Sequence, residues 1–352
     1  AKTPITPSLM TVTDLKNYQA KKREPVCTTY RSSYYICTMS PPSSGGIAIA
    51  QSLGILENFD LSQYGPTNPS NEGGVPSVMG VHLVSEAQRL AYADRDKYVA
   101  DTDFIPLPGN GVSSMIDKAY LKQRASLINP NGNSMGTATA GNLGNVPLGV
   151  DKTVEKGTTH FSIVDAYGNV VSMTSTVESS MGSYHMVGGF LLTNQLTDFS
   201  VQPTDAAGVP VANRVAPGKR PRSTMAPTLV FKGTGPGDFV MATGSPGGGT
   251  IIQYVLKTVV GALDWGLDAQ QATSLVNFGA TNSPTTNVDG ANTSLDLTGL
   301  IDGLKAKGHT VNNGAQSSGV STIMRVNRNG QTKLEGGVDP RREGIVLGDG
   351  AL

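Results

Sequence analysis

The sequence predicts a globular fold that mixes helices and strands. The chain has 352 residues, of which 38% are hydrophobic and 15% are charged, and these proportions are typical of globular proteins. Helical and strand-like hydrophobic patterns alternate along the chain without an internal repeat. The 27 basic and 27 acidic side chains balance, so charge gives no indication of a nucleic-acid partner.

No stretch of the sequence reaches the roughly 20 apolar residues that a transmembrane helix needs. The most apolar candidate, 251–267, is interrupted by Gln253, Lys257 and Asp264. The opening AKTPITPSLM lacks the charged and then apolar layout of a signal peptide, so we expect such a peptide to have been removed or never to have been part of this sequence. The length allows one large domain or two small ones.

Cys27 and Cys37 flank TTYRSSYYI, which consists of two strand-like runs around a short polar turn. In a hairpin centred near Ser32 the two cysteines lie opposite each other, at a Cα separation that suits a disulfide. The alternative is a pair of buried free thiols, because unoxidised cysteine packs well in a core. A disulfide would indicate maturation in an oxidising compartment, so we expect a periplasmic or secreted protein.

Three helices are predicted in the first hundred residues. Residues 11–20 begin with a possible cap at Thr13, a second helix follows the turn PPSSGG at 41–46, and the clearest pattern covers 77–98. The charged run DRDK at 94–97 is interpreted as a solvated face or as a cap for a neighbouring loop. The second helix is expected to pack on a sheet through its apolar positions, Ile47, Ala50, Leu53 and Leu56.

Residues 129–156 are rich in Gly, Asn, Pro and Thr and predict an exposed, mobile loop. A β-hairpin is predicted directly after it, with two alternating runs around a turn at 165–169. A symmetric register places three pairs opposite each other, Ile163 with Val171, Phe161 with Met173, and Thr158 with Thr176. A bulge at the turn would shift this register by one residue.

The first residues of this hairpin allow a specific chemistry. A threonine hydroxyl is a weak nucleophile unless a base lies within reach, and a threonine at a chain's N-terminus can use its own α-amine as that base. A flexible loop that ends in Gly157, directly before Thr158, is what self-cleavage would require. By itself the pair is far more often a plain strand start, so this hypothesis depends on other motifs.

Those motifs resemble one family. TTHFSIVDAYGNVVSMTST, GGFLLTNQLTDFS, PGKRPRSTMAPTLV and TGSPGGGTII are similar, in this order, to the gamma-glutamyltransferase family of self-processing N-terminal-nucleophile hydrolases. The upstream segments LMTVTDLKNYQAKKREPVCTTYR, PPSSGGI and AYADRDKYVAD resemble the end of that family's large subunit. The resemblance covers nearly the whole chain and implies an α+β fold, a four-layer αββα sandwich with the active site where Thr158 begins a strand.

The resemblance also implies how the chain is divided. Residues 1–157 would be the C-terminal part of the large subunit, and residues 158–352 the small catalytic subunit released by autocleavage between Gly157 and Thr158. The two would remain one globular unit, a heterodimer derived from one precursor. The family's large subunit extends further towards the N-terminus, and that extension carries the arginine expected to pair with the substrate α-carboxylate. No residue of this sequence matches that arginine.

The catalytic roles carried over from the family fall on four positions. Thr158 matches the nucleophile, with its freed amine as general base, and Thr176 matches the threonine that orients it. Gly247 and Gly248 match the glycines whose backbone amides form the oxyanion hole, since glycine lets an amide approach the reacting carbonyl closely. Without the resemblance, this glycine run would be interpreted as a plain loop.

The substrate-binding roles fall on five positions. Ser223 and Thr224 match a serine pair that binds the α-carboxylate of the glutamyl group, with threonine replacing the second serine. Gln195 and Asp198 match the pair that holds the α-ammonium; without the resemblance, Asp198 would be interpreted as a helix or turn cap. Glu178 stands where transpeptidases commonly carry asparagine. An acidic residue at this position resembles the sequence of family members that act as cephalosporin acylases or other amidohydrolases.

The expected function is therefore a gamma-glutamyl hydrolase or transpeptidase that acts on glutathione and other gamma-glutamyl amides and passes the acyl group from Thr158 to water or to an amine. Two alternatives stay open, a cephalosporin acylase-like amidohydrolase and an unprocessed chain that binds ligands or partners without catalysis. We expect no cofactor and no metal site, because the four histidines show no ligand spacing. These are His82, His160, His185 and His309, of which His160 is interpreted as a structural strand residue.

Overall fold

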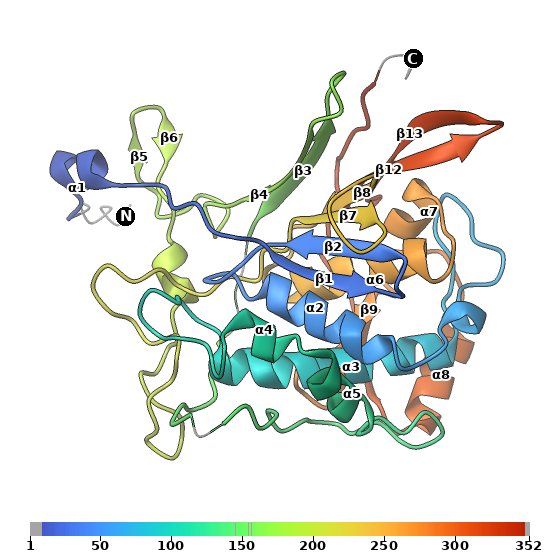
Figure 1. The fold of residues 1–352 in the computed structure, drawn as a ribbon, viewed down its shortest axis with the longest axis horizontal. Helices are drawn as coiled ribbons and strands as arrows, with labels where there is room; N and C mark the ends of the chain where they lie inside the picture. Colours follow the sequence, from blue (N-terminus) through green and yellow to red (C-terminus); the bar gives the residue numbers. More distant parts are fainter. Residues whose placement is uncertain (1–8, 145, 154, 156, 349–352) are drawn as a thin grey trace, which may run out of the picture.

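The computed structural model describes residues 9–144, 146–153, 155 and 157–348. At its centre is a six-stranded antiparallel sheet with the strand order β1-β2-β7-β8-β12-β13 (Figure 1). Strands β1 and β2 precede Gly157 and the other four follow it, so the two predicted subunits contribute to one sheet. The strands are β1 (Val26–Tyr30), β2 (Tyr34–Thr38), β7 (Thr228–Lys232), β8 (Phe239–Gly244), β12 (Ser321–Arg328) and β13 (Gln331–Val338).

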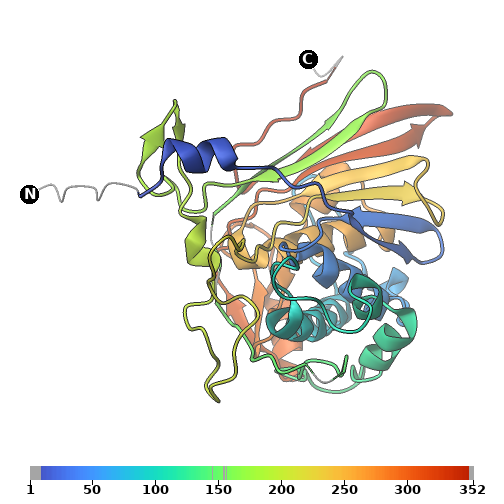
Figure 2. The ribbon, with the colours of Figure 1, turned by 60° about the vertical axis from the view of Figure 1, so that its left-hand side comes forward.

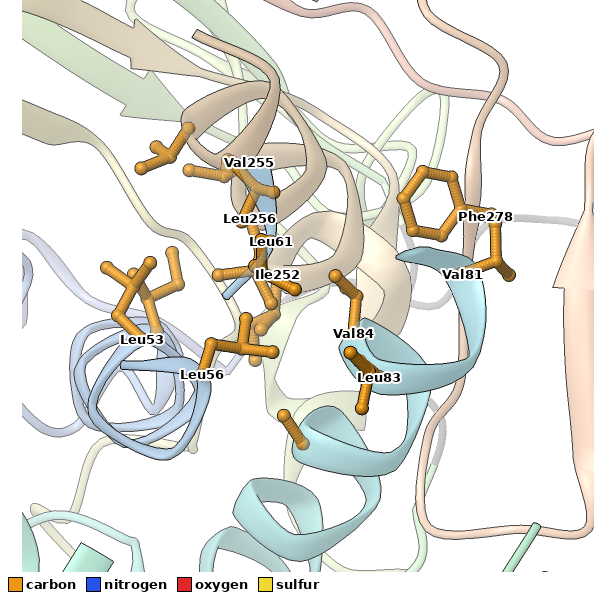
Figure 3. Close-up of a cluster of buried hydrophobic side chains, with 14 of the residues drawn as sticks. Leu53, Leu56, Leu61, Val81, Leu83, Val84, Ile252, Val255, Leu256 and Phe278 are labelled. Carbon is orange, nitrogen blue, oxygen red and sulfur yellow. The ribbon is translucent and has the colours of Figure 1, made fainter. Parts of the chain in front are cut away.

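Helices cover one face of this sheet. Helix α2 packs on β1, α6 packs on β8, and α7 packs on β12 and β13, while α3 lies against α2. Their apolar side chains form the main core, and Figure 3 shows Leu53 of α2, Val84 of α3 and Ile252 of α6 converging there. The helices are α2 (Gly45–Leu56), α3 (Val78–Tyr98), α6 (Ile251–Leu263) and α7 (Ala269–Ser274).

The remaining elements surround this body, and α1 projects from it at the same end as the β5–β6 hairpin (Figures 1 and 2). Within the described ranges, no helix combines the length and the apolar character needed to cross a membrane. These elements are α1 (Val12–Asn17), α4 (Val112–Met115), α5 (Lys118–Ala125), α8 (Thr298–Ala306), β5 (Met186–Val187), β6 (Phe190–Leu191), β9 (Phe278–Gly279), β10 (Thr285–Val288), β11 (Thr310–Asn313), and the 3₁₀ turns η1 (Ser62–Tyr64), η2 (Gln195–Asp198) and η3 (Gly248–Thr250).

The predicted hairpin forms β3 (Thr159–Val164) and β4 (Val170–Ser175), which pack against β8 and β12 as a second, two-stranded sheet. The predicted pairs Ile163 with Val171 and Phe161 with Met173 are confirmed. Thr159 opposite Ser175 is the last pair of the ladder. Thr158 and Thr176 therefore lie directly beyond it, at the end of the hairpin remote from its turn.

The polar face of the hairpin is the one that packs on the main sheet. The imidazole of His160 lies so close to Gly244 that a Cβ there would come within 2.2 Å of the ring. Burial lowers the pKa of His160 to about 4, and its Nδ1 lies 2.8 Å from Thr174 Oγ1, which fits the predicted structural role. The apolar face points outward, with exposed fractions of 40% for Phe161, 51% for Ile163, 46% for Val171 and 45% for Met173.

Two predictions about the early helices need correction. Helix α1 is capped by Thr11 and not by Thr13, because the Thr11 side chain accepts the Asp14 amide. The run at 94–97 is not a solvated face, since Asp94, Arg95 and Asp96 are buried where α3 passes beneath neighbouring segments. Asp94 does hold a loop, accepting the Gly141 amide at 2.7 Å, as the alternative interpretation of this run predicted.

The segment 129–156 contains no helix or strand among its described residues, as predicted, but it is tied to the body by hydrogen bonds. Tyr98 donates its hydroxyl to Gly141 O at 2.7 Å, and the Ala138 amide donates to Asn282 Oδ1 at 2.7 Å. The Asp151 amide donates to Asp96 O at 2.9 Å. Many side chains of this segment are exposed, as predicted, but α3 and Asn282 supply partners for its backbone that local sequence does not reveal.

The disulfide between Cys27 and Cys37 is confirmed. The two residues face each other across β1 and β2 with their Cα atoms 4.1 Å apart, in a hairpin whose turn centres on Ser32.

Replacing both cysteines with serine should lower the melting temperature by on the order of 5 °C, because closing a loop of this length restricts the unfolded chain by about 3 kcal/mol. Differential scanning calorimetry with and without reductant measures the effect. Reductant should lower the melting temperature of the wild type and leave the double variant unchanged. A wild type that melts at the same temperature under both conditions would contradict the prediction.

Candidate active site

The chain enters the β3–β4 hairpin through a constrained pair of residues. Gly157 has φ 74°, and a Cβ at this position would lie 1.2 Å from the carbonyl oxygen of Glu178, so glycine is required. Thr158 has φ 143°, a conformation that β-branched residues rarely adopt. The peptide predicted to be cleaved is thus flanked by two residues in unusual backbone conformations.

Thr158 lines a cavity of about 380 Å³ together with Gly157, Thr176 and Glu178. Four of the predicted site residues therefore meet at one place. Arg342, near the end of the described chain, also lines this cavity and was not predicted. The other lining residues are Thr159, Ser175, Val177, Ser179 and Ser180.

Thr176 is arranged so that its hydroxyl hydrogen is free to act towards Thr158. Its Oγ1 accepts the backbone amide of Glu178 at 2.7 Å. A hydroxyl that accepts such a bond keeps its own hydrogen for donation to another oxygen. Thr158 and Thr176 each lie one residue beyond the last pair of the ladder and line the same cavity, which suits the predicted orienting role.

Glu178 is buried, and its carboxylate is held by two donors. Ser179 Oγ donates to Glu178 Oε2 at 2.5 Å, and the side-chain amide of Asn194 donates to the same oxygen. Asn194 in turn accepts the Ser179 amide at 2.9 Å. The sequence analysis gave Asn194 no role, although it directly precedes Gln195 in the motif GGFLLTNQLTDFS. Asn194 connects Glu178 to η2, which carries Gln195 and Asp198.

Asp198 lies in a buried environment rich in carboxylates. Burial, together with the nearby charges of Glu155 and Glu178, raises the pKa of Asp198 to about 7, against a hydrogen bond from Gln195 that lowers it. The predicted pair Gln195 and Asp198 is thus in contact, and the predicted Glu178 lies within electrostatic range of it. A cation bound here would favour the ionised form of Asp198.

Ser223, Thr224 and the glycine run form another part of the site. Thr224 Oγ1 donates to Gly248 O at 2.6 Å, which uses the one hydrogen of that hydroxyl, and Ser223 Oγ accepts the Met225 amide at 3.1 Å. Gly247 and Gly248 precede α6, where the first amides of a helix lack intrahelical acceptors. Among the described residues, none of these four lines the cavity at Thr158.

A buried ion cluster joins these parts, and sequence reasoning missed it. Arg95 Nη2 donates to both carboxylate oxygens of Glu155 at 2.5 and 2.7 Å, and Arg222 Nε lies 3.4 Å from Glu155 Oε1. The carbonyl of Glu155 accepts the Gly249 amide at 3.0 Å. Glu155 lies two residues before Gly157, so the cluster fixes the approach of the chain to the predicted cleavage point.

Each arginine of the cluster has a second acid. Arg95 Nη1 donates to Asp96 at 2.9 Å, and Arg222 Nη2 donates to Asp151 at 3.1 Å. Burial disfavours the charged form of Arg95, but the carboxylates of Glu155 and Asp96 outweigh it and raise the pKa of Arg95. Removing one partner from such a buried group typically costs about 3–5 kcal/mol.

The structure also groups two histidines that the sequence did not connect. His82 Nδ1 lies 2.8 Å from His309 Nε2, and the possible ligand atoms of His82, His309 and Glu86 lie within 4.8 Å of one another. Both Glu86 oxygens already accept other bonds, from Arg89 at 2.5 Å and from the Met135 amide at 2.7 Å. Burial lowers the pKa of His309 to about 3, so the two rings form a neutral hydrogen-bonded pair.

A solved structure shares the fold of this chain. A cephalosporin acylase from Bacillus halodurans superimposes with a TM-score of 0.75 at 22% identity, over 96% of this chain and 55% of that chain. This likeness confirms the predicted fold class, that of the N-terminal-nucleophile hydrolases. The described residues supply three of the αββα layers, namely the helices, the six-stranded sheet and β3–β4, whose outer face is exposed.

Curated relatives carry two kinds of name. A glutathione hydrolase proenzyme of Escherichia coli K12 is 39% identical over 77% of this chain and 44% of its own length. One from Pseudomonas sp. strain A14 is 34% identical over 97% of this chain and 57% of its own. An acylase ACY 1 proenzyme of Pseudomonas sp. strain SE83 is 34% identical over 74% of this chain and 41% of its own.

The chain spans about half the length of the curated relatives that it matches. The family described as gamma-glutamyltranspeptidase matches residues 3–349, nearly all of the sequence. The chain therefore belongs to the gamma-glutamyltranspeptidase family.

Proposed function

We propose that this protein cleaves gamma-glutamyl amides, glutathione among them, through an acyl intermediate on Thr158 and passes the acyl group to water or to an amine. The observation that carries the proposal is the buried position of Asp198, close enough to Glu155 and Glu178 to feel their charges. Its pKa is raised to about 7 by burial and by the neighbouring carboxylates of Glu155 and Glu178. The α-ammonium of a gamma-glutamyl group is the kind of cation that would stabilise this carboxylate.

The proposed reaction begins with self-cleavage. Thr158 Oγ attacks the carbonyl carbon of Gly157, the peptide nitrogen becomes the free α-amine of Thr158, and water hydrolyses the resulting ester. The unusual φ values at Gly157 and Thr158 support this step, because ester formation relieves the constraint on the peptide. The two products would stay together as a heterodimer, since both contribute strands to the central sheet.

The α-amine then serves as general base for turnover. It takes the proton from Thr158 Oγ as this oxygen attacks the substrate amide, and the amides of Gly247 and Gly248 stabilise the oxyanion. The proton passes to the leaving amine, and an acyl ester on Thr158 remains. Water or an acceptor amine attacks this ester to restore the enzyme, with Thr176 orienting the nucleophile throughout.

A second candidate is an acylase that accepts aliphatic acyl amides. Two observations favour it. Glu178 places a buried acid where transpeptidases commonly carry asparagine, and the Thr224 hydroxyl donates to Gly248, so in this arrangement it is not available to a substrate carboxylate. The acylase among the relatives is 34% identical to this chain. The Cys27–Cys37 disulfide supports a periplasmic or secreted location for either enzyme.

Replacing Thr158 with alanine should give a single uncleaved chain with no detectable amidase activity, because both the attacking oxygen and the new amine are lost. Intact mass and N-terminal sequencing check cleavage, and gamma-glutamyl p-nitroanilide checks activity. Thr332→Ala, a change at an exposed threonine on β13 away from the cavity, is the matched control and should cleave normally. A Thr158→Ala protein with a normal break after Gly157 would overturn the mechanism.

Replacing Asp198 with asparagine should reduce kcat/KM for gamma-glutamyl p-nitroanilide by about 10- to 100-fold while sparing glutaryl p-nitroanilide, which has no ammonium group. In the wild type, the ratio of the two activities should rise as the pH increases towards neutrality, because burial raises the pKa of Asp198 and this carboxyl must be ionised to bind the ammonium. The α-amine of Thr158 affects both substrates alike, so the ratio isolates Asp198.

The same substitution should raise the melting temperature at pH 8. A carboxyl whose pKa is raised by folding holds its proton more tightly in the folded state, so its contribution to stability falls as the pH rises from about 4 to 7. Asparagine does not titrate, so the variant does not lose this stability as the pH rises. The exposed Asp302→Asn is the control and should change neither property. Equal losses on both substrates would favour a structural role for Asp198.

A further inference from the structure

The Arg95–Glu155–Arg222 cluster contains a carboxylate that belongs to a segment next to the predicted cleavage point. In the continuous chain Glu155 is held from both sides, by its side chain between two guanidinium groups and by its carbonyl on the Gly249 amide. After a break following Gly157, Glu155 would be the third residue from a new chain end. Chain ends are released from their contacts far more readily than continuous segments.

The two arginines are positioned by partners other than Glu155. Arg95 Nε donates to Ser44 Oγ at 2.9 Å, and Ser44 Oγ donates to the carbonyl of Ser223 at 2.7 Å. Arg222 is held by its bond to Asp151 and by its backbone amide, which donates to Asn213 Oδ1 at 2.9 Å. Both guanidinium groups would therefore keep their places if Glu155 left.

A carboxylate that replaced Glu155 would find donors already aimed at it. Arg95 Nη2 and Arg222 Nε would be released, and Arg222 Nη1 has no hydrogen-bond partner in the part of the chain that the structure describes. Loss of Glu155 would leave these N–H groups as buried donors without an acceptor, which is costly, so the vacated position favours a ligand with acceptor oxygens. Planar two-pronged bonding makes a carboxylate the matching ligand.

This position adjoins the residues proposed to hold the acyl group. Arg222 directly precedes Ser223, the Gly249 amide that bonds Glu155 directly follows Gly248, and the charge of Glu155 is felt at Asp198. Thr158 comes three positions after Glu155, so their Cα atoms lie at most about 11 Å apart. An acyl chain attached to Thr158 could reach the arginines with a carboxylate of its own.

We propose that Arg95 and Arg222 form a carboxylate-binding subsite, and that Glu155 fills it as an internal ligand until the bond after Gly157 is broken. The ligand class is a linear acyl group that carries a free carboxylate. This inference rests on the proposed function for its biological meaning. The subsite itself is defined by buried arginines, and its occupancy is measurable without catalysis.

The test uses the uncleaved Thr158→Ala chain, with and without the second change Glu155→Ala. Glutarate is the probe, and glutaramide is its uncharged counterpart. Glutarate should raise the melting temperature of the double variant by several degrees and bind with a dissociation constant at or below about 1 mM. Neither effect should appear in Thr158→Ala alone, in which Glu155 occupies the position. Thr158→Ala/Glu72→Ala, which removes an exposed acid in the loop before α3, is the matched control and should behave like Thr158→Ala.

If Thr158→Ala/Glu155→Ala is recovered unfolded, its yield of folded protein is compared after refolding in glutarate and in glutaramide. Thr158→Ala/Glu155→Gln is a second variant that keeps the shape of the side chain and removes its charge. Recovery or binding that depends on glutarate supports the proposal. Equal responses to glutarate and glutaramide, or equal responses with and without Glu155, overturn it, as does failure of both Glu155 variants to respond. Because no step needs cleavage or turnover, failure of the subsite is distinguishable from failure of the proposed function.

Discussion

The ion cluster around Glu155 is the interaction on which the arrangement of the site depends. It joins helix α3 through Arg95, the segment before Thr158 through Glu155, and the segment before Ser223 through Arg222. These three parts lie far apart in sequence, and apolar packing alone would not fix their relative positions, since it is non-directional. Directional bonds between buried charges fix both the spacing and the register of the segments they connect.

The hairpin packs on the main sheet through polar contacts, whereas the helices on the other face of that sheet pack through apolar contacts. Between the sheet and the helices, aliphatic side chains interlock. Between the sheet and β3–β4, the contacts are polar, with Ser172 Oγ donating to Thr243 O at 3.0 Å and the His160 ring lying against Gly244. Such contacts hold β3, the strand that directly follows Thr158, by specific bonds, and a nucleophile must be positioned to within fractions of an ångström.

Much of the framework could be predicted from sequence because it is set by local patterns. The alternation around 165–169 gave the register of β3 and β4, and the cysteine spacing gave the disulfide. Alternation does not say which face is buried, so the inward packing of His160 could not be predicted. Likewise the run at 94–97 has the composition of a surface, and its burial depends on segments elsewhere in the chain that supply partners.

Single residues of the site could be predicted from the sequence, but the contacts that connect them could not. The resemblance identified Thr158, Thr176 and Glu178, which the structure brings to one cavity. It did not identify Asn194 or Glu155, whose roles come from contacts between distant segments. The pairing of His82 with His309 is of the same kind, since 227 positions separate them and no spacing rule relates a helix residue to one preceding a strand.

The strand order has a consequence for how a cleaved form would come apart. Strand β2 lies inside the sheet, hydrogen-bonded to β1 on one side and to β7 on the other, and the break after Gly157 would leave β2 and β7 on different polypeptides. The seam between the two polypeptides would then run through the middle of the sheet and through the hydrophobic core. Reassembly after denaturation would become a second-order process, dependent on protein concentration, whereas refolding of the uncut chain would be a first-order process. Scission would thus convert a folding reaction into an association reaction while leaving the native contacts in place.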